Sequence, residues 1–138
     1  VIAENGMALR RLPDNRPFRR RDNLTRSRYL REHVRVVSRL VEQGQPLVGY
    51  LHWSLCDNYE WGSFAPRFGL YSLDYTVYPT RHAVDATGDN PSATYAHEVY
   101  EARAQLAAAS RRAGRRGTTS ATMSNGSNIL PPDSVKNI

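Results

Sequence analysis

The sequence predicts an α/β fold with parallel strands, because strand-like and helix-like segments alternate along its first part. Two strand-like segments, at residues 1–3 and 47–53, are each followed by apolar residues at helical spacing. The second segment is almost continuously apolar, which is typical of a strand buried on both faces in a parallel sheet. This apolar pattern vanishes after about Ser110.

The first strand ends at Glu4, and a helix is predicted after the polar loop that follows. Asp22 or Asn23 is expected to cap this helix, because a short side-chain oxygen accepts hydrogen bonds from the free N–H groups of a first turn. Gly44 is expected to end it. Its buried stripe consists of Leu30, Val34, Val37 and Val41.

A polar and aromatic loop is predicted over residues 54–66, and a further extended segment over residues 68–75. Pro91 is expected to begin the second helix, where its missing N–H costs nothing. The buried stripe of that helix consists of Tyr95, Val99, Ala102 and Leu106. Residues 1–109 are therefore taken as the folded part. Residues 110–138 are predicted to be a disordered, low-complexity tail, because they carry too little apolar surface to offset the entropy of ordering.

The net charge of +6 comes almost entirely from arginine, since 18 of the 19 basic residues are Arg. Such a basic chain can contact phosphate backbones, but no base-stacking ladder or groove-reading motif accompanies the arginines. We therefore favour a solvated helix face and expect no nucleic-acid partner. No apolar run reaches the roughly 20 residues of a membrane helix, so no membrane partner is expected either. The four histidines share no ligand spacing, so no metal or other cofactor is expected.

Acidic and aromatic residues follow both predicted strands, where parallel folds place their active sites. Glu4 follows the first strand, and the second leads from Trp53 to Glu60 and Trp61. An indole stacks on the apolar face of a sugar, while a carboxylate accepts hydrogen bonds from its hydroxyls. Spacing alone pairs Glu4 with Glu60 as the two catalytic carboxylates of a glycosidase. The alternative is that the tryptophans only fill the core.

Two motifs in this order resemble glycoside hydrolase family 1. V-I-A-E-N-G at residues 1–6 is similar to the family's I-T-E-N-G-type nucleophile strand, with Ala3 where Thr is usual. G-Y-L-H-W-S-L-C-D-N-Y-E-W at residues 49–61 resembles its G-Y-x-x-W-S-L-x-D-N-[FY]-E-W signature, and R-F-G-L-Y follows at 67–71. Residues of the intervening helix also match the family: Asp22, Arg26, Tyr29, Leu30 and His33.

The resemblance implies a role for each site residue. Glu4 would be the nucleophile, and Glu60 would grip the hydroxyls at carbons 4 and 6 of the sugar instead of acting as the acid. Trp61 would bond a neighbouring hydroxyl, Trp53 would form the stacking floor, and Phe68 would line the pocket. A carboxylate at position 60 repels a phosphate, so unphosphorylated β-glucosides or short β-linked oligosaccharides are the expected substrates, with galactosides and fucosides as alternatives.

The resemblance also implies a (β/α)8 barrel, of which residues 1–109 would be the C-terminal part, about the last two strand–helix units. The family's general acid comes from an Asn-Glu-Pro run that this sequence lacks. We therefore expect a retaining β-glucosidase that needs the N-terminal half of the barrel, and an inactive isolated chain. The alternative is a catalytically dead truncated product or a weak sugar-binding remnant. A cytoplasmic location is expected, although a chain that begins at Val1 says nothing about a signal peptide on a longer parent.

Overall fold

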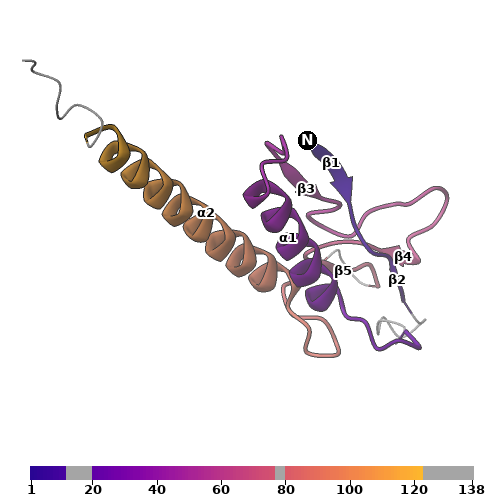
Figure 1. The fold of residues 1–138 in the computed structure, drawn as a ribbon. Helices are drawn as coiled ribbons and strands as arrows, with labels where there is room; N and C mark the ends of the chain where they lie inside the picture. Colours follow the sequence, from indigo (N-terminus) through magenta and orange to yellow (C-terminus); the bar gives the residue numbers. More distant parts are fainter. Residues whose placement is uncertain (12–19, 77–79, 123–138) are drawn as a thin grey trace, which may run out of the picture. The chain divides into compact units, whose positions relative to one another are not determined.

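A computed structural model describes residues 1–11, 20–76 and 80–122 of the chain (Figure 1). The chain divides into two units, Val1–Leu106 and Ala107–Ile138, and the contacts described below all lie within the first. The elements in chain order are β1 (Ile2–Asn5), β2 (Leu9–Arg10), α1 (Arg26–Glu42), β3 (Tyr50–His52), β4 (Pro66–Arg67), β5 (Ser72–Asp74), β6 (Thr80–His82) and α2 (Pro91–Thr122).

The strands form three two-stranded sheets. β1 and β3 are parallel, with Ile2 opposite Tyr50, and α1 connects them, as the alternating pattern predicted. β2 pairs with β4 and β5 pairs with β6, both antiparallel. The described residues therefore form an α/β unit in which no barrel is closed.

Helix α1 begins later than the sequence suggested. Its N-cap is Thr25, whose hydroxyl accepts a hydrogen bond from the Arg28 N–H at 3.1 Å. The predicted cap Asp22 instead accepts from the Leu24 N–H and from the guanidinium of Arg20, which lowers its pKa to about 2. The capping oxygen therefore belongs to Thr25, three residues before the bonded N–H, and not to Asp22 or Asn23.

Strand β3 is shorter and more exposed than predicted. The apolar run at 47–53 was expected to be buried on both faces, yet Val48 is 85% exposed and Leu51 is 57% exposed. Among the described residues β3 pairs with no strand besides β1, so one of its edges has no partner strand there. The extended segment predicted at 68–75 is a strand only at Ser72–Asp74.

Helix α2 begins at Pro91 as predicted, and the Asn90 side chain caps it by accepting from the Ala93 N–H at 3.1 Å. Its predicted stripe is half-buried, and the Tyr95 hydroxyl donates to the Tyr50 carbonyl at 3.4 Å. Although the apolar pattern ends near Ser110, the helix continues to Thr122. Residues 110–122 contain four arginines and two alanines, which are strong helix formers, together with serine, threonine and glycine. Residues 123–138 of the predicted tail lie outside the described residues.

The apolar core of the described unit is small. Its buried hydrophobic side chains are Met7, Leu9, Leu30, Val34 and Leu70. A buried polar cluster around Asp57 and Arg26 lies beside it, each of the two being 2% exposed. Over the described part of the chain, neither helix combines the length and the apolar character that crossing a membrane requires.

Candidate active site

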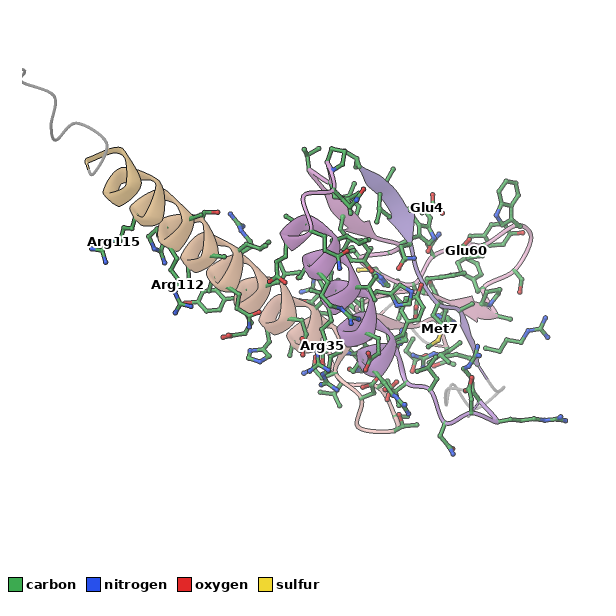
Figure 2. All side chains as sticks on the ribbon, viewed as in Figure 1. Glu4, Met7, Arg35, Glu60, Arg112 and Arg115 are labelled. Atoms are coloured by element: carbon green, nitrogen blue, oxygen red, sulfur yellow. The ribbon has the colours of Figure 1, made fainter. Side chains whose placement is uncertain are left out.

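One cavity of about 660 Å³ brings together all five residues that the sequence singled out. It is lined by Glu4, Asn5, Gly6, Ala8, Arg10, Trp53, Glu60, Trp61, Pro66 and Phe68. Figure 2 shows Glu4 on β1 close to Glu60 in the loop that follows β3. The cavity therefore joins segments that are more than fifty positions apart in the sequence, because parallel pairing places the ends of β1 and β3 at one edge.

Glu4 lies on the exposed side of β1. Within the described residues its carboxylate makes no hydrogen bond or ion pair, so it is available to a ligand. The next residue, Asn5, links β1 to its neighbours. Its side-chain oxygen accepts hydrogen bonds from the hydroxyls of Tyr29 on α1 at 3.0 Å and Tyr50 on β3 at 2.9 Å. Burial raises the pKa of both tyrosines, which keeps them protonated as donors.

Gly6 lets the end of β1 approach Trp53 closely. A Cβ at this position would overlap the Trp53 carbonyl and lie 3.2 Å from the Phe68 ring. The Trp53 N–H also donates to the Asn5 carbonyl at 2.9 Å. Backbone contacts thus set the separation between Glu4 and the Trp53 loop, and only glycine fits between them.

Trp53 and Glu60 form the polar wall of the cavity. The Trp53 indole Nε1–H donates to Glu60 Oε1 at 2.8 Å, and the peptide between Trp53 and Ser54 is cis. An indole N–H only donates, so this bond orients Glu60 as an acceptor. The pairing of Glu4 with Glu60 as nucleophile and acid, suggested by spacing alone, therefore receives no support from this geometry.

Trp61 sits at the tip of a tight turn. The Glu60 N–H donates to the Ser63 carbonyl at 2.8 Å, and the Ser63 N–H donates back at 3.2 Å. The two central residues have positive φ, 48° at Trp61 and 107° at Gly62, as in a type I′ turn. Trp61 is fully exposed at 102%, so no packing explains why a bulky residue occupies this conformation. Strained residues of this kind concentrate at functional sites.

Phe68 reaches the cavity from the strand side. Its carbonyl accepts from His52 Nε2 at 3.1 Å, and the His52 ring is half-buried next to β1. Burial lowers the pKa of His52, which favours the neutral ring. A neutral ring with its proton on Nε2 donates this bond and holds the Phe68 backbone beside Trp53.

Asp57 fixes the loop that carries Trp53, Glu60 and Trp61. Its carboxylate accepts from the backbone N–H groups of Gly69 at 2.9 Å and Leu73 at 3.1 Å. Asp57 therefore shapes the loop by bonding backbone groups on two further segments. Gly69 fits tightly here, since an added Cβ would overlap the backbones of Asp57, Tyr71 and Cys56.

Three arginines surround the Asp57 carboxylate. Arg67, Arg26 and Arg11 approach it at 3.5, 3.6 and 3.8 Å. Arg26 also donates to the Gly69 carbonyl at 2.6 Å and pairs with Asp85 at 3.4 Å. Burial lowers the pKa of Arg11. Because these three buried arginines share the Asp57 carboxylate, its loss would leave their positive charges poorly compensated.

Arg10 was missed by the sequence analysis, which counted it within an arginine-rich, solvated helix face. The structure instead places it on β2, where it lines the cavity with Glu4 and Glu60. Strand alternation next to the buried Leu9 is the signal that points to this position, but two residues are too few to reveal it. No group of three or more metal-ligating side chains occurs among the described residues.

Comparison with known proteins identifies relatives of the chain. It matches the family described as Glycosyl hydrolase family 1 over residues 1–116. It is 44% identical over 77 residues to a beta-galactosidase of Saccharolobus solfataricus, covering 55% of this chain and 14% of the relative. It is 42% identical over 82 residues to a bifunctional beta-D-glucosidase/beta-D-fucosidase of Bifidobacterium breve, covering 54% and 17%.

A 1,4-beta-D-glucan glucohydrolase of Thermotoga neapolitana is 47% identical over 50 residues, covering 36% of this chain and 12% of that enzyme. The chain thus spans less than a fifth of the length of these curated relatives. No solved structure matches it. Because the family match covers most of the chain and includes every residue of the cavity, the chain belongs to glycosyl hydrolase family 1.

Proposed function

We propose that this chain carries the nucleophile and the sugar-binding wall of a retaining β-glycosidase that hydrolyses terminal β-D-glucosyl residues. The supporting observation is that one cavity is lined by Trp53, Glu60, Trp61 and Glu4, whose carboxylate has no partner among the described residues. The relatives, a beta-galactosidase and a bifunctional beta-D-glucosidase/beta-D-fucosidase among them, also favour a β-glycoside substrate.

In the proposed reaction, a carboxylate oxygen of Glu4 attacks the anomeric carbon of the bound sugar. The bond to the leaving-group oxygen breaks, and that oxygen takes a proton from a general acid. Water then attacks the resulting glycosyl ester, gives up a proton to the same group and releases Glu4 as a carboxylate. Two inversions at one carbon retain the β configuration.

The remaining cavity residues would hold the sugar in place for this attack. Trp53 offers an aromatic surface. Its Nε1–H donates to Glu60 Oε1, so the indole leaves the second oxygen of the Glu60 carboxylate available. We assign the free oxygen to sugar hydroxyls at carbons 4 and 6, with Trp61 as a further donor and Phe68 as an apolar wall. A phosphate at carbon 6 would be repelled by Glu60, so the substrate is an unphosphorylated glucoside or short β-linked oligosaccharide.

We infer that the general acid comes from outside this segment. One Glu60 oxygen accepts from the Trp53 indole and the other is assigned to the sugar, and besides Glu4 and Glu60 the described residues place no carboxylate in the cavity. We therefore propose that activity requires the N-terminal half of a (β/α)8 barrel, and that the isolated chain is inactive. A retaining enzyme needs that acid about 5 Å from the nucleophile.

A chimera tests this proposal. Residues 1–109 of this chain would replace the homologous segment of the Saccharolobus solfataricus β-galactosidase, which then supplies the rest of the fold. We expect turnover of an aryl β-glucoside, and a loss of at least about 10³-fold in kcat on Glu4→Gln. Glu42→Gln, at the exposed end of α1, is the matched control and should retain activity.

The outcomes separate the two candidate functions. Sugar binding without turnover in a folded chimera would favour the non-catalytic, sugar-binding remnant. Turnover that survives Glu4→Gln would contradict the assignment of the nucleophile. Turnover by the isolated chain would contradict the need for a second half.

A further inference from the structure

Arg10 reaches the cavity because β2 alternates between two environments. In the antiparallel pair of β2 with β4, Leu9 is opposite Arg67 and Arg10 is opposite Pro66. Leu9 and Arg67, each 7% exposed, face the buried side, where Arg67 approaches Asp57. Their neighbours Arg10 and Pro66 both line the cavity instead. The register of two short strands thus delivers a cation to the same space as Glu4.

The guanidinium of Arg10 is not used by the protein itself. Within the described residues it forms no side-chain hydrogen bond and no ion pair, although Glu4 and Glu60 line the same cavity. Glu4 is needed for attack, and Glu60 is bonded to the Trp53 indole. Guanidinium presents a planar fork of N–H donors that matches a carboxylate or another oxyanion, whereas sugar hydroxyls need no such charge.

We propose that Arg10 is a specificity-determining residue that binds an acidic group on the leaving-group part of the substrate. This inference rests on the proposed function and names its substrate class, β-glucosides with an anionic aglycone. The acidic group belongs on the leaving group because Glu60, in its proposed place at carbons 4 and 6, repels an anion on the sugar. Arg10 lies on β2, whereas Glu60 lies in the loop after β3, and we assign the two side chains to different parts of the substrate.

Intrinsic fluorescence of the full 138-residue chain provides the test, because its two tryptophans, Trp53 and Trp61, both line the cavity. Three ligands are titrated: phenyl β-D-glucoside, 4-carboxyphenyl β-D-glucoside and phenyl β-D-glucuronide, which carries its acid on the sugar. We expect the carboxyphenyl glucoside to bind about fivefold more tightly than the neutral glucoside, as for a partly exposed ion pair. The glucuronide should gain nothing, and the preference should shrink at high salt.

Four variants identify the cation. Arg10→Gln should abolish the preference for the acidic over the neutral glucoside, and Arg10→Lys should retain part of it. Arg10→Glu should reverse it, so that a 4-aminomethylphenyl glucoside binds better than the carboxyphenyl one. Arg103→Gln, an equal loss of charge at an exposed position on α2 that does not line the cavity, should leave the preference intact.

Each outcome bears on one claim. Equal binding of the neutral and acidic glucosides, or a preference that persists in Arg10→Gln, overturns the role of Arg10 and leaves the sugar site standing. A gain for the glucuronide also overturns it, because the anion would then be bound on the sugar side. Failure of all three ligands to alter the fluorescence of the chain removes the sugar site itself, and the inference falls with it.

Discussion

Replacing Trp61 by asparagine should raise the stability of the protein and lower its catalytic efficiency on a β-glucoside. Trp61 holds φ at 48°, a left-handed conformation that costs an ordinary L-residue roughly 1–2 kcal/mol. Asparagine tolerates this region, and Asn-Gly is the preferred central pair of a type I′ turn. Because Trp61 is 102% exposed, its removal forfeits no packing. We therefore expect Trp61→Asn to raise the free energy of unfolding by about 1 kcal/mol.

Urea denaturation followed by far-ultraviolet circular dichroism measures this change without depending on the lost indole. Trp61→Val is the matched control, since a β-branched side chain is strongly disfavoured at positive φ and should be less stable than the wild type. In the chimera, Trp61→Asn should reduce kcat/KM for an aryl β-glucoside by about tenfold or more, through loss of an aromatic contact and a donor.

Two results would contradict strain at Trp61: a Trp61→Asn variant less stable than the wild type, or equal stability of Trp61→Val and Trp61→Asn. Either result would mean that the indole makes stabilising contacts in the folded protein or that the turn relaxes on substitution. A stabilised Trp61→Asn variant with full activity would instead mean that Trp61 does not bind the sugar, although its turn is strained.

Three further perturbations probe the scaffold behind the site. Asp57→Ala should lower the free energy of unfolding in urea by about 3–5 kcal/mol, because it leaves buried arginines without their carboxylate. Asp22→Asn, which removes an exposed carboxylate, is the control and should leave the unfolding midpoint nearly unchanged. Similar effects of the two substitutions would contradict the stabilising role of the Asp57 cluster. Gly69→Ala should cost about 1–3 kcal/mol by the same assay, since its Cβ would meet only backbone atoms, and a neutral effect would show that the loop has room. The pKa of His52 is lowered by burial, so the unfolded chain takes up its proton first and stability should fall as the pH drops below 6.5. His52→Gln should flatten this dependence in unfolding curves recorded between pH 7 and pH 5, and an unchanged slope would assign it to other groups.

The order β1, α1, β3 and α2, and the meeting of Glu4 with Trp53, Glu60 and Trp61, were accessible from sequence for a simple reason. Parallel strands on either side of a helix end at the same edge, so residues after β1 and β3 had to meet. Glu4 and the Trp53–Trp61 segment do line one cavity. Their chemical roles, which the resemblance implied, stay predictions until the enzyme is assayed.

Features that depend on register or on competition between neighbours were not accessible. Arg10 belongs to a two-residue strand, and only its pairing with Pro66 shows which side it faces. Thr25 displaced Asp22 as the cap because several oxygens competed for one set of N–H groups. The burial of residues 47–53 on both faces was predicted from composition, but such burial requires packing on both faces, and the described residues leave Val48 and Leu51 exposed.

The most direct measurement is the site of covalent labelling in the chimera. A 2-deoxy-2-fluoro-β-D-glucosyl fluoride combines a good leaving group with a substituent that slows hydrolysis of the intermediate, so the glycosyl ester accumulates on the nucleophile. Peptide mass mapping should find one fluoroglucosyl group on the peptide that contains Glu4, and none in Glu4→Gln. A label on another carboxylate, or full turnover of an aryl glucoside with no label on Glu4, would contradict the assignment.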